Sequence, residues 1–349
     1  MLGNLSGFQT RVRQFVSDVI TNHCRIHREA LAAKTLPASL NVILQEVIKI
    51  VNFVKSSALN TRLFRNLCLD MDAAYMNLLY HTEIRWLSKG NVLKRVLDLK
   101  EETTEFLKLQ KRTHWHDLFE NHEWITRLCY LCDIFERLNT LNLSLQGKDS
   151  NIMDFVDKLS AFLAMLDLWR NRINSGRITM FSHLCSYVED CEISISEALQ
   201  NDIATHLQSR KDEFSRYFPE TTKSKFNLVR NPFLAKIDDC IPDNQDAAQE
   251  DFIKLVNDSG AQTLFSRVDL PSFWSSMLGS YPIVSQIALK LLMPFPSTYL
   301  CEAAFSSMLV IKTKARNRLD VESDLRCCLA ITQPRIQKLV DEKQHQKSH

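Results

Sequence analysis

The sequence predicts a mainly α-helical protein with a few short strands, and three observations support this expectation. Only 7 Gly and 9 Pro occur among the 349 residues, which argues against a turn-rich all-β fold. Apolar residues recur at helical spacings through most of the chain. Hydrophobic residues make up 45% and charged residues 24% of the sequence, as in an ordinary globular protein. The length suffices for two domains or for one large interrupted domain.

Composition and charge exclude several functional classes. The formal net charge of +2 gives no global electrostatic case for nucleic acid, so any DNA-binding surface would be local. No apolar run approaches about 18 residues, and we expect no membrane span. Ten cysteines in a sequence without a recognisable signal peptide indicate reduced, intracellular thiols.

The first part of the chain predicts helices around one short strand. An apolar stripe over residues 8–19 fits a helix. Residues 20–24 suit a short strand, and a second helix follows over residues 26–34. Apolar residues then repeat at helical spacings over residues 41–80, which predicts a long helical stretch with a packing role.

Two short motifs lie in the first 90 residues. Cys24 and His27 form a C-x-x-H pair, but no second pair lies nearby, so we expect a buried thiol and a hydrogen-bonded histidine rather than zinc. Arg85 and Trp86 precede an amphipathic, charged helix expected over residues 91–109. Taken alone, this dipeptide is a cation beside a packed aromatic ring.

Residues 111–215 read as entirely helical. A C-x-x-C pair, Cys129 and Cys132, follows three histidines and invites a zinc interpretation. The pair falls within an amphipathic helix, however, where cysteines act as small buried hydrophobes, and we favour that alternative. A further helical face and two connections, over residues 147–150 and 174–176, complete the region. The histidines are His114, His116 and His122, and the face comprises Leu159, Phe162, Leu163, Leu166 and Trp169.

Residues 216–260 break the helical pattern with three prolines. Residues 226–229 suit a short strand. The acidic residues that follow, from Asp238 to Asp251, read as a solvated loop, because no calcium-loop spacing is present.

The last third of the chain predicts three helices and a frayed end. Residues 283–292 place Ile283, Ile287, Ala288, Leu291 and Leu292 on one helical face. A helix is expected from residue 297 to 309, where Phe305, Met308 and Leu309 share a face. Glu302 lies one turn before Phe305, and its simplest role is that of a helix-start carboxylate favoured by the macrodipole. A last helix follows Arg318, and residues 341–349 form a polar tail that we expect to be disordered.

The last third also carries a set of motifs in a fixed order. These are Phe273-Trp274, Tyr281-Pro282, residues 294–297, Glu302 with Phe305-Ser306, and the run from Arg316 to Leu319. Their order resembles the C-terminal region of hAT-superfamily DNA transposases and of domesticated, transposase-derived relatives of the BED-finger and SCAN type. The stretch from His81 to Gly90 resembles the T-x-x-R-W element of the same family, and Cys24 with His27 matches its C/D-x-x-H motif.

This resemblance implies a fold and a domain plan. It implies a truncated RNase H-like core, interrupted by a large all-helical insertion and followed by the hAT C-terminal dimerisation region. Residues 1–80 would be a remnant of the core with its leading helices, and residues 81–215 the helical insertion. Residues 216–340 would hold the rest of the core with the dimerisation region, and residues 341–349 the tail.

The resemblance also implies roles for the motif residues. Glu302 occupies the position of the third metal-binding carboxylate of the catalytic core. The strands that bear the first two aspartates, and the N-terminal zinc finger, would precede Met1. Strand transfer needs carboxylates that hold two metal ions, so we expect no enzymatic activity, no metal and no cofactor. Trp86 would stack on an unpaired base, and Arg85 would contact phosphate.

The expected function is that of a catalytically inactive transposase-derived protein in the nucleus. We expect a homodimer, possible residual DNA binding, no membrane association and no small-molecule substrate. One alternative is a fragment or subunit of an active hAT transposase, and another is an interaction scaffold without DNA affinity. The DNA-contact candidates are Arg85, Trp86, Lys89, Lys312, Lys314, Arg316 and Arg318. The dimerisation candidates are Phe305, Met308, Leu319, Leu325 and Leu329.

Overall fold

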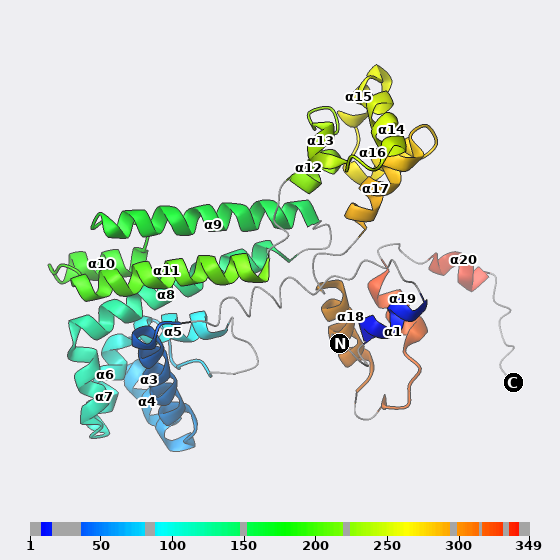
Figure 1. The fold of residues 1–349 in the computed structure, drawn as a ribbon. Helices are drawn as coiled ribbons and strands as arrows, with labels where there is room; N and C mark the ends of the chain where they lie inside the picture. Colours follow the sequence, from blue (N-terminus) through cyan, green and yellow to red (C-terminus); the bar gives the residue numbers. More distant parts are fainter. Residues whose placement is uncertain are drawn as a thin grey trace, which may run out of the picture. The chain divides into compact units, whose positions relative to one another are not determined.

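The computed structural model contains only helices, turns and irregular segments in the residues that it describes (Figure 1). The mainly α prediction is therefore confirmed, but no strand occurs in these residues. The strand expected at residues 20–24 lies outside them. The described residues are 8–15, 36–80, 88–146, 152–218, 224–293, 299–313, 316–330 and 335–341.

The chain divides into two compact units. The first comprises residues 1–146 and 150–296, and the second comprises residues 147–149 and 297–349. No helix among the described residues is long and apolar enough to cross a membrane.

The first unit begins with α1 (Phe8–Phe15), α3 (Ala38–Lys55) and α4 (Ala58–Asp70). The helical stretch expected over residues 41–80 is confirmed by α3 and α4, but the chain breaks before Ser57 and is not helical over 71–80. The Ser57 hydroxyl accepts a hydrogen bond from the Asn60 N–H at 3.2 Å and caps α4. Seven side chains of α3 are buried at helical spacings: Leu40, Ile43, Leu44, Val47, Ile50, Val51 and Val54.

Four helices follow, and the last of them lies at the centre of the core. They are α5 (Ser88–Asp98), α6 (Lys100–Leu109), α7 (Thr113–Glu120) and α8 (His122–Ser144). The helix expected over 91–109 is interrupted at Leu99, a fully buried residue whose backbone departs from helical geometry. Helices α3, α5 and α10 all pack against α8. Because neighbours surround α8, its buried residues cover most of its circumference.

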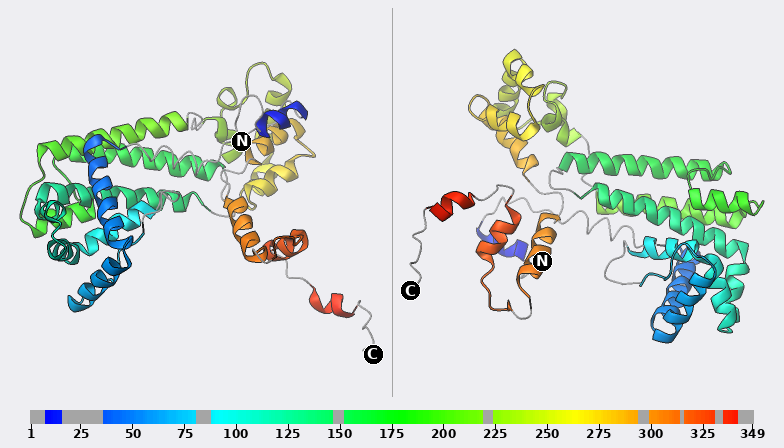
Figure 2. Two further views of the ribbon diagram at one scale, coloured as in Figure 1. Left: turned by 90° about the horizontal axis from the view of Figure 1, so that it is seen from below. Right: turned by 180° about the vertical axis from the view of Figure 1, so that it is seen from behind.

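Three more helices complete this bundle: α9 (Ile152–Asn174), α10 (Ser182–Asp190) and α11 (Glu197–Tyr217). Figures 1 and 2 show α8, α9 and α11 side by side, and α11 packs along α9. The predicted face of α9 is confirmed, since Leu159, Phe162, Leu166 and Trp169 are buried. The predicted connection at 174–176 is also confirmed by a turn.

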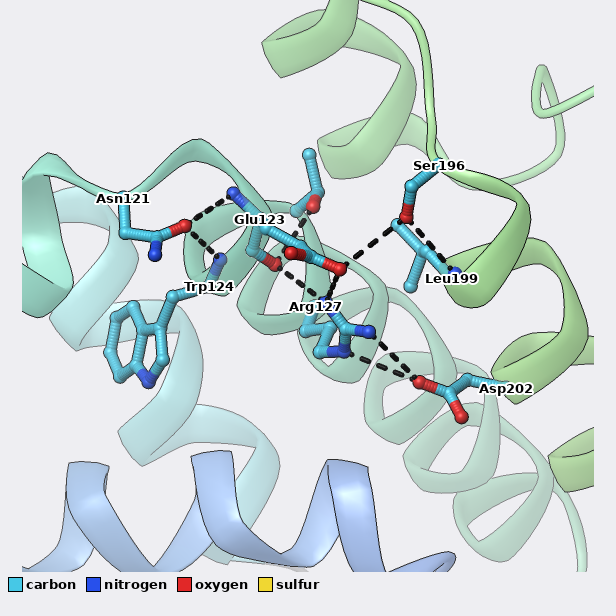
Figure 3. A network of polar contacts seen from close by, with 8 residues as sticks. Asn121, Glu123, Trp124, Arg127, Ser196, Leu199 and Asp202 are labelled. Atoms are coloured by element: carbon cyan, nitrogen blue, oxygen red, sulfur yellow. Dashed lines mark hydrogen bonds and ion pairs between the residues drawn. The ribbon is translucent and has the colours of Figure 1, made fainter.

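A polar network joins the N-terminal ends of α8 and α11 (Figure 3). The Asn121 side chain caps α8 by accepting hydrogen bonds from the N–H groups of Glu123 and Trp124. The Arg127 guanidinium lies 2.9 Å from a Glu123 oxygen and 3.1 Å from an Asp202 oxygen. Arg127 therefore ties α11 to the first turn of α8.

A second polar chain lies inside the bundle. The Tyr130 hydroxyl lies 2.8 Å from His206 Nδ1, and Arg210 Nε donates to His206 Nε2, also at 2.8 Å. All three residues are fully buried. Because Nε2 accepts from arginine, the His206 proton lies on Nδ1, which donates to the tyrosine oxygen. Burial raises the pKa of the Tyr130 hydroxyl, which stays neutral.

The remainder of the first unit is a cluster of short helices. The strand expected at residues 226–229 is wrong, because these residues lie in a helix with Phe226, Leu228 and Val229 buried. Trp274 is fully buried, and its Nε1 donates to the Val229 carbonyl at 3.0 Å. The helices are α12 (Ser224–Arg230), α13 (Ile237–Cys240), α14 (Asp246–Val256), α15 (Ser259–Phe265), α16 (Leu270–Met277) and α17 (Pro282–Leu292).

The acidic segment expected here as a solvated loop is largely helical, because α13 and α14 occupy much of it, although its residues Asp238, Asp243, Asp246 and Glu250 are exposed as predicted. Asp251 is buried and accepts hydrogen bonds from the N–H groups of Ile283 and Val284, which caps α17. The buried face of α17 is correspondingly rotated from the predicted one. Val284 and Ala288 are buried, whereas Ile283 is 41% exposed.

Two aspartates at helix starts make the stability of this cluster depend on pH. The Tyr281 hydroxyl and two N–H groups of α15 lower the pKa of Asp258, and the Ser272 N–H lowers that of Asp269. The resulting stabilisation is present above the unfolded pKa of 3.8 and is lost as the pH falls through the lower folded pKa. We expect D258N/D269N to show a smaller drop in melting temperature between pH 5 and pH 3 than the unchanged chain. Circular dichroism measures this, and equal drops would contradict it.

Four helices of the bundle end in the same left-handed cap. The residue after the C-cap has a φ of 53° at Asp72, 54° at Lys111, 52° at Glu192 and 74° at Gly176. In each case, two backbone N–H groups close the last turn in the Schellman pattern, as in Arg112 N to Leu107 O at 2.8 Å. Only one of the four positions is glycine, although a left-handed conformation costs other residues roughly 1–2 kcal/mol.

These caps predict opposite effects of two substitutions. Glu192→Gly is expected to raise the free energy of unfolding by about 0.5 kcal/mol, because glycine adopts a φ of 52° without steric cost. Gly176→Ala is expected to lower it by about 1 kcal/mol. Urea denaturation of the two variants measures both changes. A loss of stability in Glu192→Gly would contradict the assignment of strain to this cap.

The second unit contains α18 (Tyr299–Ile311), α19 (Glu322–Leu329) and α20 (Ile336–Asp341). Helices α18 and α19 pack against each other. The helix predicted over 297–309 is confirmed with shifted ends, as is the helix predicted after Arg318.

Candidate functional site

The second unit is distinguished by the absence of a core among its described residues. Every described side chain of α18 and α19 is exposed or half-buried. In the described chain, the last buried apolar residue is Ala288, in the first unit. Yet α18 is rich in apolar residues, with the sequence YLCEAAFSSMLVI. An apolar helix without buried side chains leaves a surface that another molecule can cover.

The two sides of α18 differ in exposure. Phe305 is 60%, Leu309 71% and Val310 80% exposed. Met308 and Ile311 are half-buried, so the side that carries them is partly covered within the unit. We call Phe305, Leu309 and Val310 the apolar face of α18. Sequence periodicity grouped Phe305 with Leu309 but missed Val310.

The predicted dimerisation residues fall into two groups. Phe305 and Leu329 are exposed, whereas Met308, Leu319 and Leu325 are half-buried. Leu325 lies on α19, the helix that packs against α18. Met308 and Leu325 thus lie on the two helices that pack against each other, whereas Phe305 and Leu329 keep much of their surface exposed.

The DNA-contact candidates are placed only in part. Lys312, Arg316 and Arg318 follow α18 and are exposed, and none forms an ion pair with a carboxylate of the described residues. Lys89 is the second residue of α5 and is half-buried. Arg85, Trp86, Lys314 and the Cys24–His27 motif lie outside the described residues. Glu302 is the fourth residue of α18, and its side chain also lies outside them.

Among the described residues, neither cysteine of the C-x-x-C pair of α8 belongs to a group of three possible ligands within metal-binding distance. Cys129 and Cys132 are buried, as predicted. Burial raises the pKa of the Cys129 thiol to about 12 and that of Cys132 well above its ordinary value. Both thiols are therefore protonated at neutral pH, as expected of small buried side chains in a helix.

The described residues contain one group of possible ligands within metal-binding distance, Asp133, Glu136 and His183. Asp133 Oδ1 accepts from the Ser182 hydroxyl at 3.1 Å and the His183 N–H at 3.0 Å, and Oδ2 accepts from the Leu184 N–H at 3.0 Å. Burial raises the pKa of Asp133, although the two backbone N–H groups favour its charged form. These contacts make Asp133 a cap for α10, supplied by α8.

Two family models match the chain. Residues 23–174 match the FAM200/GTF2IRD2 helical domain, and residues 246–332 match the hAT family C-terminal dimerisation region. The exposed apolar face of α18 lies within the second match. The chain is thus a domesticated protein derived from a hAT transposase.

One relative indicates the particular kind of hAT-derived protein. The chain is 33% identical over 304 residues to General transcription factor II-I repeat domain-containing protein 2 of Bos taurus. The alignment covers 87% of this chain and 31% of that relative, so the chain spans less than a third of the relative's length. No solved structure matches the chain.

Proposed function

We propose that the chain is a non-catalytic binding protein that forms a homodimer through α18 and α19. The observation that carries this proposal is the apolar face of α18, whose three large side chains are 60–80% exposed. The match of residues 246–332 to a dimerisation region supports a second copy of the chain as the partner. A two-fold interface would bring the same face of both copies together.

The size of the apolar face suits a weak to moderate dimer. Burying one large apolar side chain contributes roughly 1.5–3 kcal/mol. A two-fold dimer would bury the three side chains of each copy, about 9–18 kcal/mol in total. Loss of rotational and translational freedom costs roughly 4–15 kcal/mol. The gain and the cost are of the same order, so the dimer would also draw on Leu329 and on the ends of both helices as further contacts.

Solution mass is the direct test of the homodimer. Multi-angle light scattering of the purified chain is expected to give a mass near twice 40.4 kDa, with dissociation on dilution. A mass equal to that of the monomer at all concentrations would contradict the proposed homodimer.

Nuclear location and residual DNA binding form a second part of the proposal. The chain is similar to a protein whose name refers to general transcription factor II-I repeats, and this similarity supports a nuclear location. The exposed Lys312, Arg316 and Arg318 supply a local basic surface for DNA. Binding through phosphate contacts weakens steeply with salt, so affinity for a DNA duplex measured against salt concentration tests this part. No detectable binding at low salt would favour an interaction scaffold without DNA affinity.

The absence of catalysis is the third part. Within this chain, the resemblance supplies only Glu302 of the three carboxylates that a two-metal RNase H-like site requires. An RNase H-like core, which the hAT resemblance implies, is also part of this proposal. Nicking of a DNA duplex by the pure chain with Mg²⁺, abolished in Glu302→Gln, would instead support a fragment or subunit of an active transposase.

A further inference from the structure

A basic cavity lies in the helical bundle of the first unit, outside α18 and α19. It has a volume of about 430 Å³ and lies between α3 and the junction of α6 with α7. Its lining includes three cations, Lys49, Lys111 and Arg112, and one carboxylate, Glu46. Three positive charges and one negative charge leave a net charge of +2 when the lining histidine is neutral.

The one carboxylate is already engaged. Glu46 Oε1 lies 2.8 Å from Lys49 Nζ, and Oε2 accepts from Trp115 Nε1 at 3.0 Å. The bond to Lys49 makes the largest contribution to lowering the pKa of Glu46, with Trp115 adding to it. Lys111 and Arg112, in contrast, form no ion pair with a carboxylate of the described residues. The uncompensated charge of the cavity therefore belongs to these two adjacent residues.

The Arg112 guanidinium and the Lys111 backbone are held in place before any ligand arrives. The Arg112 guanidinium carbon lies 4.6 Å from the centre of the Phe53 ring and 5.9 Å from that of Trp115. The backbone of Lys111 is fixed by the left-handed cap of α6, and the Arg112 N–H closes the same cap. A stacked guanidinium loses little conformational freedom on binding, and its planar fork suits an anion with several oxygens.

We propose that this cavity binds a phosphorylated side chain of a partner protein. A phosphate dianion would neutralise the net charge of +2, with Arg112 contacting two oxygens and Lys111 a third. Helix α7 starts at the cavity and has no side-chain cap, so its first N–H groups add to the attraction for an anion. Nucleic acid requires cations along the path of a backbone, whereas Lys111 and Arg112 are adjacent residues that can meet at a single phosphate group. The inference is independent of the proposed dimer.

The test measures fluorescence anisotropy of a labelled peptide with one phosphoserine among neutral residues. The unphosphorylated peptide and a labelled DNA duplex are compared at the same ionic strength. The chain is expected to bind the phosphopeptide, and inorganic phosphate should displace it more effectively than chloride. Lys111→Gly is expected to weaken binding about 10-fold, since it removes a charge-assisted contact. Glycine suits the backbone at a φ of 54°, so this variant keeps the cap.

A nearby lysine supplies the matched control. Lys108 lies on α6, does not line the cavity and is 3.5 Å from Glu105. Lys108→Gln removes the same charge and is expected to change affinity by less than about twofold. Arg112→Met is a second loss-of-binding variant that keeps the stem on Phe53. The proposal is overturned if the phosphopeptide binds no better than its unphosphorylated form, if Lys111→Gly and Arg112→Met bind normally, or if the duplex binds more tightly than the phosphopeptide.

Discussion

Replacing Leu309 by glutamate is expected to convert the proposed dimer into a monomer. Leu309 is 71% exposed and lies between Phe305 and Val310 in the apolar face of α18. In a two-fold dimer, the substitution would place two carboxylates in the interface and remove two leucines. We expect the dissociation constant to rise about 100-fold or more, because an unpaired buried charge adds to the lost apolar contact. Light scattering over a range of concentrations measures the shift.

The control for this experiment changes an equally exposed leucine elsewhere. Leu59 lies on α4 in the first unit and is 58% exposed. Leu59→Glu is expected to leave the mass unchanged. If both variants remained dimeric, the chain would associate through a different surface. If both became monomeric, the effect would not be specific to α18.

Asp133→Ala is expected to cause a large loss of stability in the bundle. Asp133 is 3% exposed and accepts three hydrogen bonds from the first turn of α10. Alanine would leave the N–H groups of His183 and Leu184 without these acceptors, and Leu184 is fully buried. We expect the free energy of unfolding to fall by about 3 kcal/mol, as measured by urea denaturation.

Ser182→Ala separates the backbone contribution from that of the hydroxyl. It removes only the bond from Ser182 Oγ to Asp133 Oδ1 and keeps both backbone bonds. A loss of about 1 kcal/mol or less is expected. If Asp133→Ala cost no more than Ser182→Ala, the carboxylate would not be acting as the cap of α10.

The long amphipathic helices were the most predictable part of the fold. The pattern that predicted a helix around Cys129 and Cys132 also predicted their burial, because both features follow from the 3.6-residue period. Breaks within helices were harder to predict. The break before Ser57 had a signal, a serine three residues before the amide that it caps. The break at Leu99 had no such sequence signal, because the backbone conformation of this residue depends on the packing of its buried side chain.

Short apolar runs and acidic residues misled the sequence analysis for a different reason. Phe226, Leu228 and Val229 suit either a strand or a short helix, and only their neighbours decide between the two. Asp251 looked like one more solvated carboxylate, but it caps a helix that begins more than 30 residues later. Within the candidate site, periodicity found Phe305 and Leu309. It gave no sign that Met308 would be half-buried, since that depends on the packing of α19 against α18.

None of the described side chains of α18 and α19 is buried, and this bears on how this part of the chain melts. A unit that gains its apolar contacts only on pairing has little intrinsic stability, and its unfolding is linked to dissociation by mass action. Calorimetry of the whole chain should then resolve two transitions. The melting temperature of the first unit would be independent of protein concentration. The melting temperature of the second unit would rise with protein concentration. The concentration of the protein in the cell would thereby determine the fraction of molecules in which the second unit is folded.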